Sequence, residues 1–183
     1  PGWETNGGWD VWPLDVNAGN WNRAQGEGHN ESYRALELSG TTSTGYVAFW
    51  QEVPAYPGEL HHMTVYAKQD SENPLQAGQT AYANIEFWGW GWFGPYMVSQ
   101  HTTTAVTTNS PDDTWIKLNI AAVAPGAALN THVVVVFNNP NGNSNGAIYF
   151  DDLSYRRNVH SENSNFYNGG SYSLTINGSR IVQ

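Results

Sequence analysis

The 183-residue sequence contains no cysteine, and it has only seven lysine and arginine residues against sixteen aspartates and glutamates. The absence of cysteine excludes disulfide bonds and thiol chemistry. A net charge of −9 disfavours a nucleic-acid partner, because such a partner requires a basic protein surface. The anionic surface of a membrane is disfavoured for the same reason. The longest aliphatic and aromatic run, Val133 to Phe137, is far too short to span a bilayer.

Charged residues make up only 13% of the chain, whereas aromatic residues make up 14%. A typical globular protein is about one quarter charged, and here Gly, Asn, Ser and Thr fill the difference. The abundance of aromatic and β-branched residues is not the composition of a disordered chain. It is typical of an extracellular β protein with many turns, and the length fits one domain or one domain with a tail.

Short alternating segments separated by turn clusters predict an all-β fold without helices. In 61–68, for example, Met63, Val65 and Ala67 alternate with polar residues. The first thirty residues show weak periodicity and are expected to form a long loop region. We predict a β-sandwich of two antiparallel sheets, of the jelly-roll, galactose-binding-like type. Strands are expected near 33–38, 45–53, 61–68, 80–92, 114–120, 131–138, 146–155 and 171–176.

Trp88, Trp90 and Trp92 occupy every second position of one predicted strand. Alternate residues of a strand share a face, so the three indoles are expected to lie on the same face, with glycines between them. Three exposed indoles on one face indicate an interaction site. A flat ring beside hydrogen-bonding groups suits a sugar, which has an apolar C–H face and a polar rim. The sequence therefore predicts a carbohydrate-binding face.

Polar side chains on this face would orient the ligand. Asn84 and Glu86 share the predicted face with the three indoles. Tyr66 and Trp50 belong to other strands and are further candidates for contacting the ligand. No His-x-His or His-Glu-x-x-His spacing indicates a catalytic metal.

Asp151 and Asp152 form a second candidate site near the end of the chain. In a regular strand Tyr149, Asp151, Leu153 and Tyr155 would share the core side. A carboxylate facing the core is costly unless it is paired or bound to a metal, and calcium takes hard oxygen ligands. Edge carboxylates that hold the N–H groups of a turn are the alternative.

Three segments resemble the β-sandwich carbohydrate-binding modules, in the broad group that includes families four, nine, sixteen and twenty-two. The resemblance spans about residues 1–157 and leaves 158–183 as a polar linker with one possible final strand. Its motifs are Phe49-Trp50-Gln51-Glu52-Val53 before Pro57-Gly58, Trp115-Ile116-Lys117-Leu118 before Ala124-Pro125-Gly126, and Ile148-Tyr149-Phe150-Asp151-Asp152-Leu153-Ser154.

This resemblance implies non-catalytic binding of a polysaccharide by a secreted, extracellular module of bacterial type. It also implies a structural calcium near Asp151 and Asp152, with Glu31 in the matching loop as a candidate ligand. The module would act as a monomer, tethered to a glycan-degrading enzyme in a larger chain. The acidic charge favours a neutral β-glycan such as glucan, xylan or mannan over a polyanion.

Two other functions fit the same strands. A β-sandwich polysaccharide hydrolase or lyase would need a pair of carboxylates or a basic cluster at its site. No Glu-x-Asp-x-x-Glu motif is present, and the only adjacent basic pair is Arg156-Arg157. A structural or adhesion domain would instead use the aromatic face to bind a protein. We therefore expect a binding module and not an enzyme.

Overall fold

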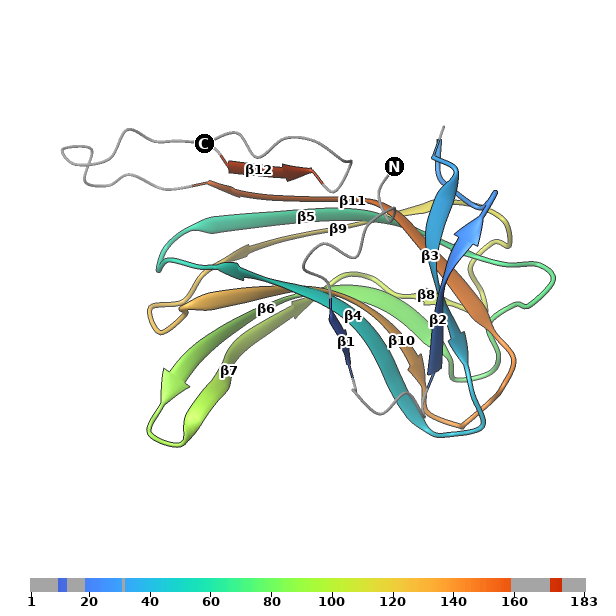
Figure 1. The fold of residues 1–183 in the computed structure, drawn as a ribbon, viewed down its shortest axis with the longest axis horizontal. Coiled ribbons are helices and arrows are strands. Elements are labelled where there is room, and N and C mark those ends of the chain that lie inside the picture. Colours follow the sequence, from blue (N-terminus) through green and yellow to red (C-terminus); the bar gives the residue numbers. More distant parts are fainter. Residues whose placement is uncertain (1–9, 13–18, 31, 159–171, 176–183) are drawn as a thin grey trace.

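The computed structural model describes residues 10–12, 19–30, 32–158 and 172–175. These residues form twelve strands in two sheets that face each other (Figure 1). None of them belongs to a helix that could cross a membrane. The paired strands are antiparallel throughout both sheets, which confirms the predicted β-sandwich.

The first sheet has the strand order β1-β4-β10-β6-β7, and β8 pairs with the start of β6. Its strands β4 and β10 curve strongly (Figure 1). The bounds are β1 Asp10–Trp12, β4 Gly45–Pro54, β6 Thr80–Gly91, β7 Gly94–Thr102, β8 Val106–Thr107 and β10 Asn130–Asn139.

The second sheet has the strand order β2-β3-β11-β5-β9, and β12 pairs with the end of β11. The bounds are β2 Gly19–Gln25, β3 Arg34–Gly40, β5 Leu60–Gln69, β9 Ile116–Val123, β11 Ala147–Asn158 and β12 Tyr172–Thr175.

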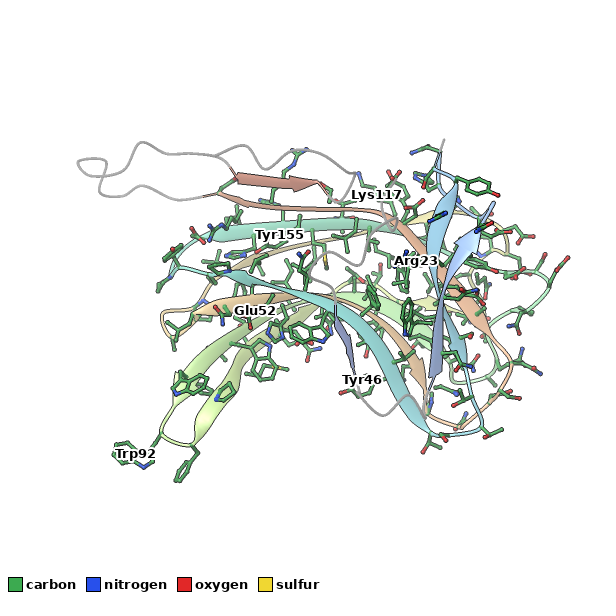
Figure 2. All side chains as sticks on the ribbon, in the orientation of Figure 1. Arg23, Tyr46, Glu52, Trp92, Lys117 and Tyr155 are labelled. Carbon is green, nitrogen blue, oxygen red and sulfur yellow. The ribbon has the colours of Figure 1, made fainter. Side chains whose placement is uncertain are left out.

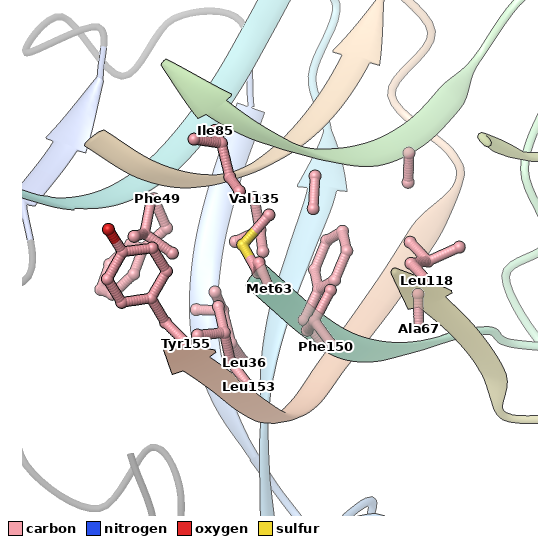
Figure 3. Packing of buried hydrophobic residues seen from close by; sticks show 14 of the residues in the cluster. Leu36, Phe49, Met63, Ala67, Ile85, Leu118, Val135, Phe150, Leu153 and Tyr155 are labelled. Atoms are coloured by element: carbon pink, nitrogen blue, oxygen red, sulfur yellow. The ribbon is translucent and has the colours of Figure 1, made fainter. Parts of the chain in front are cut away.

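The core lies between the sheets and is built mainly from alternate residues of β3, β4, β5, β6, β9, β10 and β11. Ile85 and Phe87 of β6 face Met63 of β5 and Phe150 of β11, and all four are fully buried. Figure 3 shows Ile85, Met63 and Phe150 between the two layers. Because one face of each strand is buried here, the register of the sheets is fixed, since a slip of one residue would expose these side chains.

Strand β10 departs from alternation because both of its faces are covered. Val133, Val135 and Phe137 point into the core, whereas Val134 and Val136 pack with Ala48 on the outer face of the first sheet. β10 lies between β4 and β6 in the middle of the sheet. Burial on both faces explains why the longest apolar run of the sequence lies in this strand.

All eight segments predicted as strands are strands in the structure, with ends shifted by a few residues. The prediction of a loop over the first thirty residues was wrong for β1 and β2. Trp92 and Phe93 form a turn after β6, and Gly94 then begins strand β7, which was not predicted. The final strand expected within 158–183 is β12, and the boundary after residue 157 stays a prediction.

A polar cluster lies at one end of the otherwise apolar core. His61 is fully buried, its ring bonds to the Tyr155 hydroxyl, and its Nε2 lies 3.6 Å from the Glu59 carboxylate. Arg157 and the backbone N–H of Tyr56 donate to the same carboxylate at 3.3 and 3.2 Å. Burial, with smaller contributions from the charges of Arg157 and His62, lowers the pKa of His61 to about 4. The folded protein therefore holds this imidazole neutral at pH 7.

We expect the free energy of unfolding to fall as the pH drops from about 6.5 to about 4. Over this interval the unfolded chain takes up a proton at His61 and the folded chain does not, so acid favours unfolding. A pKa lowered from 6.5 to about 4 corresponds to a loss of about 3 kcal/mol. Urea unfolding followed by Trp fluorescence at several pH values measures this loss. The variant His61→Gln should show a shallower pH dependence, and an unchanged slope would contradict the assignment.

Candidate functional site

The outer face of the first sheet carries a groove of about 580 Å³, with walls from β4, β6, β7 and β10. This volume lies within the range of small-ligand sites, about 300–1,000 Å³. The inward residues of β6 fill the core, and its outward residues therefore line the groove. The aromatic and polar residues of its lining are Tyr46, Trp50, Tyr82, Asn84, Glu86, Trp88, Gln100 and His132.

Three aromatic rings from neighbouring strands stack against one another along one side of this groove. The His132 ring on β10 lies between Trp50 of β4 and Trp88 of β6, with ring centroids 4.3 and 5.1 Å away and interplanar angles of 29° and 28°. The Glu52 carboxylate holds His132 Nε2 at 3.2 Å. Each indole therefore gives one ring face to His132 and has only its other face for a ligand.

Hydrogen bonds fix the polar groups beside the Trp88 ring. Glu86 accepts from Trp88 Nε1 and from Asn84 Nδ2, each at 3.3 Å. Asn84 belongs to the groove lining but is only 2% exposed. Its Oδ1 is buried and has no hydrogen-bond partner among the described residues. A buried carbonyl oxygen without a partner is costly, and a ligand hydroxyl would reach this one only after the Asn84 side chain turned toward the groove.

The glycines that alternate with the indoles allow close packing against the opposite face of the same strand. A Cβ on Gly89 would lie 2.6 Å from the backbone oxygen of Ala127 and 3.3 Å from the Tyr96 ring. A Cβ on Gly91 would also approach the Tyr96 ring, at 3.3 Å. The Trp-Gly alternation thus lets β6 pack closely on its back while it presents indoles on its front.

The structure brings together four of the seven predicted ligand-binding residues, namely Trp50, Asn84, Glu86 and Trp88. Trp90 and Trp92 lie beyond the groove at the end of the β6–β7 hairpin and are 71% and 95% exposed. Figure 2 shows Trp92 pointing away from the sandwich.

Tyr66 is the seventh candidate and does not join this groove. It lies on β5 in the second sheet, where its ring stacks on His29 with a centroid distance of 3.9 Å. Conversely, the sequence analysis did not select His132, Tyr46 or Tyr82. Alternation alone places Tyr82 beside Asn84, but His132 becomes visible only once β10 is known to lie between β4 and β6.

Asp151 and Asp152 form a bulge in β11. The pairing with β5 shifts between Asp151 and Ser154, and Asp152 has a φ of 48°. The bulge reverses the alternation, so that Phe150 faces the core before it and Leu153 after it. The prediction that Tyr149 shares the core side was therefore wrong, because Tyr149 packs on the outer face of the second sheet, near Lys68.

Backbone and side-chain N–H groups surround the two carboxylates of this bulge. Asp151 is fully buried, and its two oxygens accept from the backbone N–H groups of His29 and Asp152, at 2.8 and 2.7 Å. Burial raises the pKa of Asp151, whereas these two hydrogen bonds lower it. Asp152 pairs with His29 Nδ1 at 2.8 Å and accepts from Asn30 Nδ2 at 3.1 Å.

This arrangement matches the alternative to calcium, in which the carboxylates hold N–H groups of a turn, because such groups face both Asp151 oxygens and one Asp152 oxygen. A carboxylate oxygen that accepts one hydrogen bond keeps a second lone pair, so the calcium site stays a prediction. Within the part of the chain that the structure describes, no three acidic or histidine residues are grouped to hold a metal. Glu31, the third predicted ligand, lies outside the described residues.

No protein-family model matches the sequence, and no curated protein matches it. Solved structures are similar in fold. One is the CBM22-2 xylan-binding domain of Xyn10C from Paenibacillus barcinonensis, with a TM-score of 0.54 and 19% identity over 82% of this chain and 92% of that one. Another is TmCBM61 in complex with β-1,4-galactotriose, with a TM-score of 0.50 and 12% identity over 80% and 86%.

A third similar structure holds the CBM22-1 and GH10 modules of endo-1,4-β-D-xylanase 10B from Clostridium thermocellum with xylohexaose. Its TM-score is 0.55 and its identity 15%, over 81% of this chain but only 26% of that one. This chain thus spans about a quarter of that protein. At these identities the likeness concerns architecture, and the fold is the β-sandwich of carbohydrate-binding modules.

The stability of the Asp151 bulge is expected to come from N–H donors and not from an ion. We predict that EDTA leaves the free energy of unfolding unchanged. Asp151→Ala should lower it by about 1–3 kcal/mol for each of the two N–H groups left without a partner. Urea unfolding in calcium and in EDTA, for both proteins, measures this. A loss of stability in EDTA that disappears in Asp151→Ala would instead establish the calcium site.

Proposed function

We propose that the groove on the first sheet binds a polysaccharide non-covalently and that the protein is a carbohydrate-binding module. A sugar ring would stack on Trp88 or Trp50, on the ring face that His132 does not cover, while Glu86 and Asn84 form hydrogen bonds with its hydroxyl groups. Trp90 and Trp92 extend the aromatic surface beyond the groove. Tyr66, on the second sheet, is left out of this proposal.

The observation that carries the proposal is the groove itself, in which the stacked rings of Trp50, His132 and Trp88 lie beside the amide of Asn84 and the carboxylate of Glu86. Aromatic ring faces beside hydrogen-bonding groups match a ligand that carries hydroxyl groups around an apolar C–H face. Sugars combine these two features in one ring.

A neutral β-glycan such as glucan, xylan or mannan suits this site best. The chain carries a net charge of −9, and Glu52 and Glu86 flank His132 at the groove, so a polyanion would be repelled. Each stacked ring is worth about 0.5–1.5 kcal/mol, which places the expected affinity for a short glycan at about micromolar to millimolar. Weak binding of this kind suits a module that tethers a secreted enzyme to a repeating polymer.

The carboxylates of Glu52 and Glu86, on either side of His132, act as acceptors in this proposal and not as catalysts. Glu52 and Glu86 lie on either side of His132 in one cross-strand row, roughly 10 Å apart between their backbones. Inverting glycosidases hold their carboxylates at similar separations. However, both Glu86 oxygens accept hydrogen bonds from N–H groups. The Glu52 carboxylate in turn contacts Nε2 of His132. An acid catalyst needs a carboxyl group that donates a proton, so we propose binding without hydrolysis.

The variant Trp88→Ala should weaken glycan binding about 2- to 12-fold, the equivalent of one stacked ring. Affinity electrophoresis in gels that contain soluble xylan, β-glucan or galactomannan measures the change. Trp115→Ala is the matched control, because it removes an indole from the second sheet, where Trp115 contacts His29 and Lys68. Retardation of the control should equal that of the parent protein.

Two results would overturn the proposal. Equal retardation of Trp88→Ala and the parent protein on every glycan that binds would remove the groove as the site. Release of reducing ends or of unsaturated products by the isolated chain would show a hydrolase or lyase instead. A protein that binds no glycan but forms a stable complex with another protein would be an adhesion domain.

A further inference from the structure

The β6–β7 hairpin extends past the rest of its sheet. The pairing of β6 with β10 ends at Trp88 and Asn130, and the residues of β6 beyond Trp88 pair only with β7. Figure 1 shows this hairpin projecting from the body of the sandwich. Its tip therefore lies outside the core, and its side chains contribute little to folding.

The tip is nevertheless the most apolar part of the exposed surface that the structure describes. Five of the eleven large exposed apolar side chains lie in 90–97. Trp92 and Phe93 form the turn itself and are 95% and 100% exposed. Turn positions ordinarily carry small polar residues, and a concentrated exposed apolar patch marks an interaction site. These two rings are thus candidates for contact with a partner.

Packing behind the strand holds the hairpin in place. The Tyr96 ring lies over Gly89 and Gly91, and the backbone N–H of Leu129 donates to the Trp88 carbonyl at 2.8 Å. Gly94 closes the turn at a φ of 115°, a conformation that side-chain-bearing residues rarely adopt. The tip is therefore preorganised, which lowers the entropy lost when it binds a ligand.

The groove and the tip share one hairpin, which indicates what the tip binds. Trp88, Pro95 and Met97 line the groove, and Trp90 follows Trp88 on the same face of β6. From Tyr82 to Trp88 the groove runs roughly 20 Å along β6. A chain that lies along β6 and leaves the groove at Trp88 would next meet Trp90 and then the turn.

We infer that Trp92 and Phe93 bind the continuation of the glycan that occupies the groove, so that the bound stretch of chain reaches from the groove to the tip of the hairpin. This inference rests on the proposed function. A membrane is the less favoured occupant, because residues 84–104 contain no lysine or arginine, and basic residues are what attract a protein to anionic lipid. The affinity should therefore increase with the length of the glycan beyond what the groove covers.

The test uses the double variant Trp92→Ser/Phe93→Ser, whose side chains leave no cavity when they are removed. Tyr33→Ser/Tyr56→Ser is the matched control, since it removes two rings that are each 59% exposed and lie outside the hairpin. Calorimetry would measure the Kd for cello-, xylo- and manno-oligosaccharides of about three to ten units. The parent polysaccharides would be tested by affinity electrophoresis.

For the hairpin variant we expect an unchanged Kd for trimers and a Kd about 5-fold or more higher for the longest chains, since each lost ring costs about 2- to 12-fold. The control should match the parent protein at every length.

Equal Kd values for the parent protein and the hairpin variant at all lengths would overturn the inference, while the groove would remain the proposed binding site. If the parent protein binds neutral or anionic lipid vesicles and the hairpin variant does not, while both bind glycan equally, the tip would be a membrane-binding site instead. Failure of the parent protein to bind any of these sugars would overturn the proposed function as well.

Discussion

The side chains on the two faces of β6 have linked directions, because successive residues of a strand point to opposite sides. The groove depends on this constraint. Ile85 and Phe87 are fully buried between the sheets, and the loss of such burial costs several kcal/mol. Because a slip of one residue would turn them out to water, the core fixes the outward direction of Asn84, Glu86 and Trp88. The position of the groove residues is thus maintained by packing on the opposite side of the strand.

Neighbouring strands then determine how those outward residues can act. An isolated strand would present Trp88 with both ring faces exposed, but β10 inserts His132 against one of them and β4 adds Trp50 behind it. The stack holds the indoles in place and leaves each at most one ring face for a ligand. Glu86 is likewise held by Trp88 and Asn84. The site therefore has little to reorganise when a ligand enters, which favours binding by a small number of contacts.

The sequence was sufficient wherever local periodicity controls the structure. Alternation predicted eight of the strands, the core face of β5 and the outward face of β6, because a strand reveals its pattern within a few residues. It could not show the pairing of β10 with β4 and β6, on which the position of His132 depends. It also missed the bulge at Asp152, whose φ of 48° changes which residues of β11 face the core. Strands β2 and β7 were missed because their outward faces are mostly exposed and their patterns weak.

The Asp151 bulge shows that residue type alone does not decide between a metal site and carboxylates that hold a loop. Two adjacent carboxylates near a loop can bind calcium together with further oxygen ligands, and the same carboxylates can hold the loop through its N–H groups. The two cases differ in the groups that face the carboxylate. Neighbouring oxygen atoms repel a carboxylate unless a cation lies between them, whereas N–H groups stabilise its negative charge by hydrogen bonds. Here the backbone N–H of His29 donates to Asp151, and the imidazole ring of His29 contacts Asp152. His29 thereby joins its loop to β11, and its ring also stacks on Tyr66 of the second sheet.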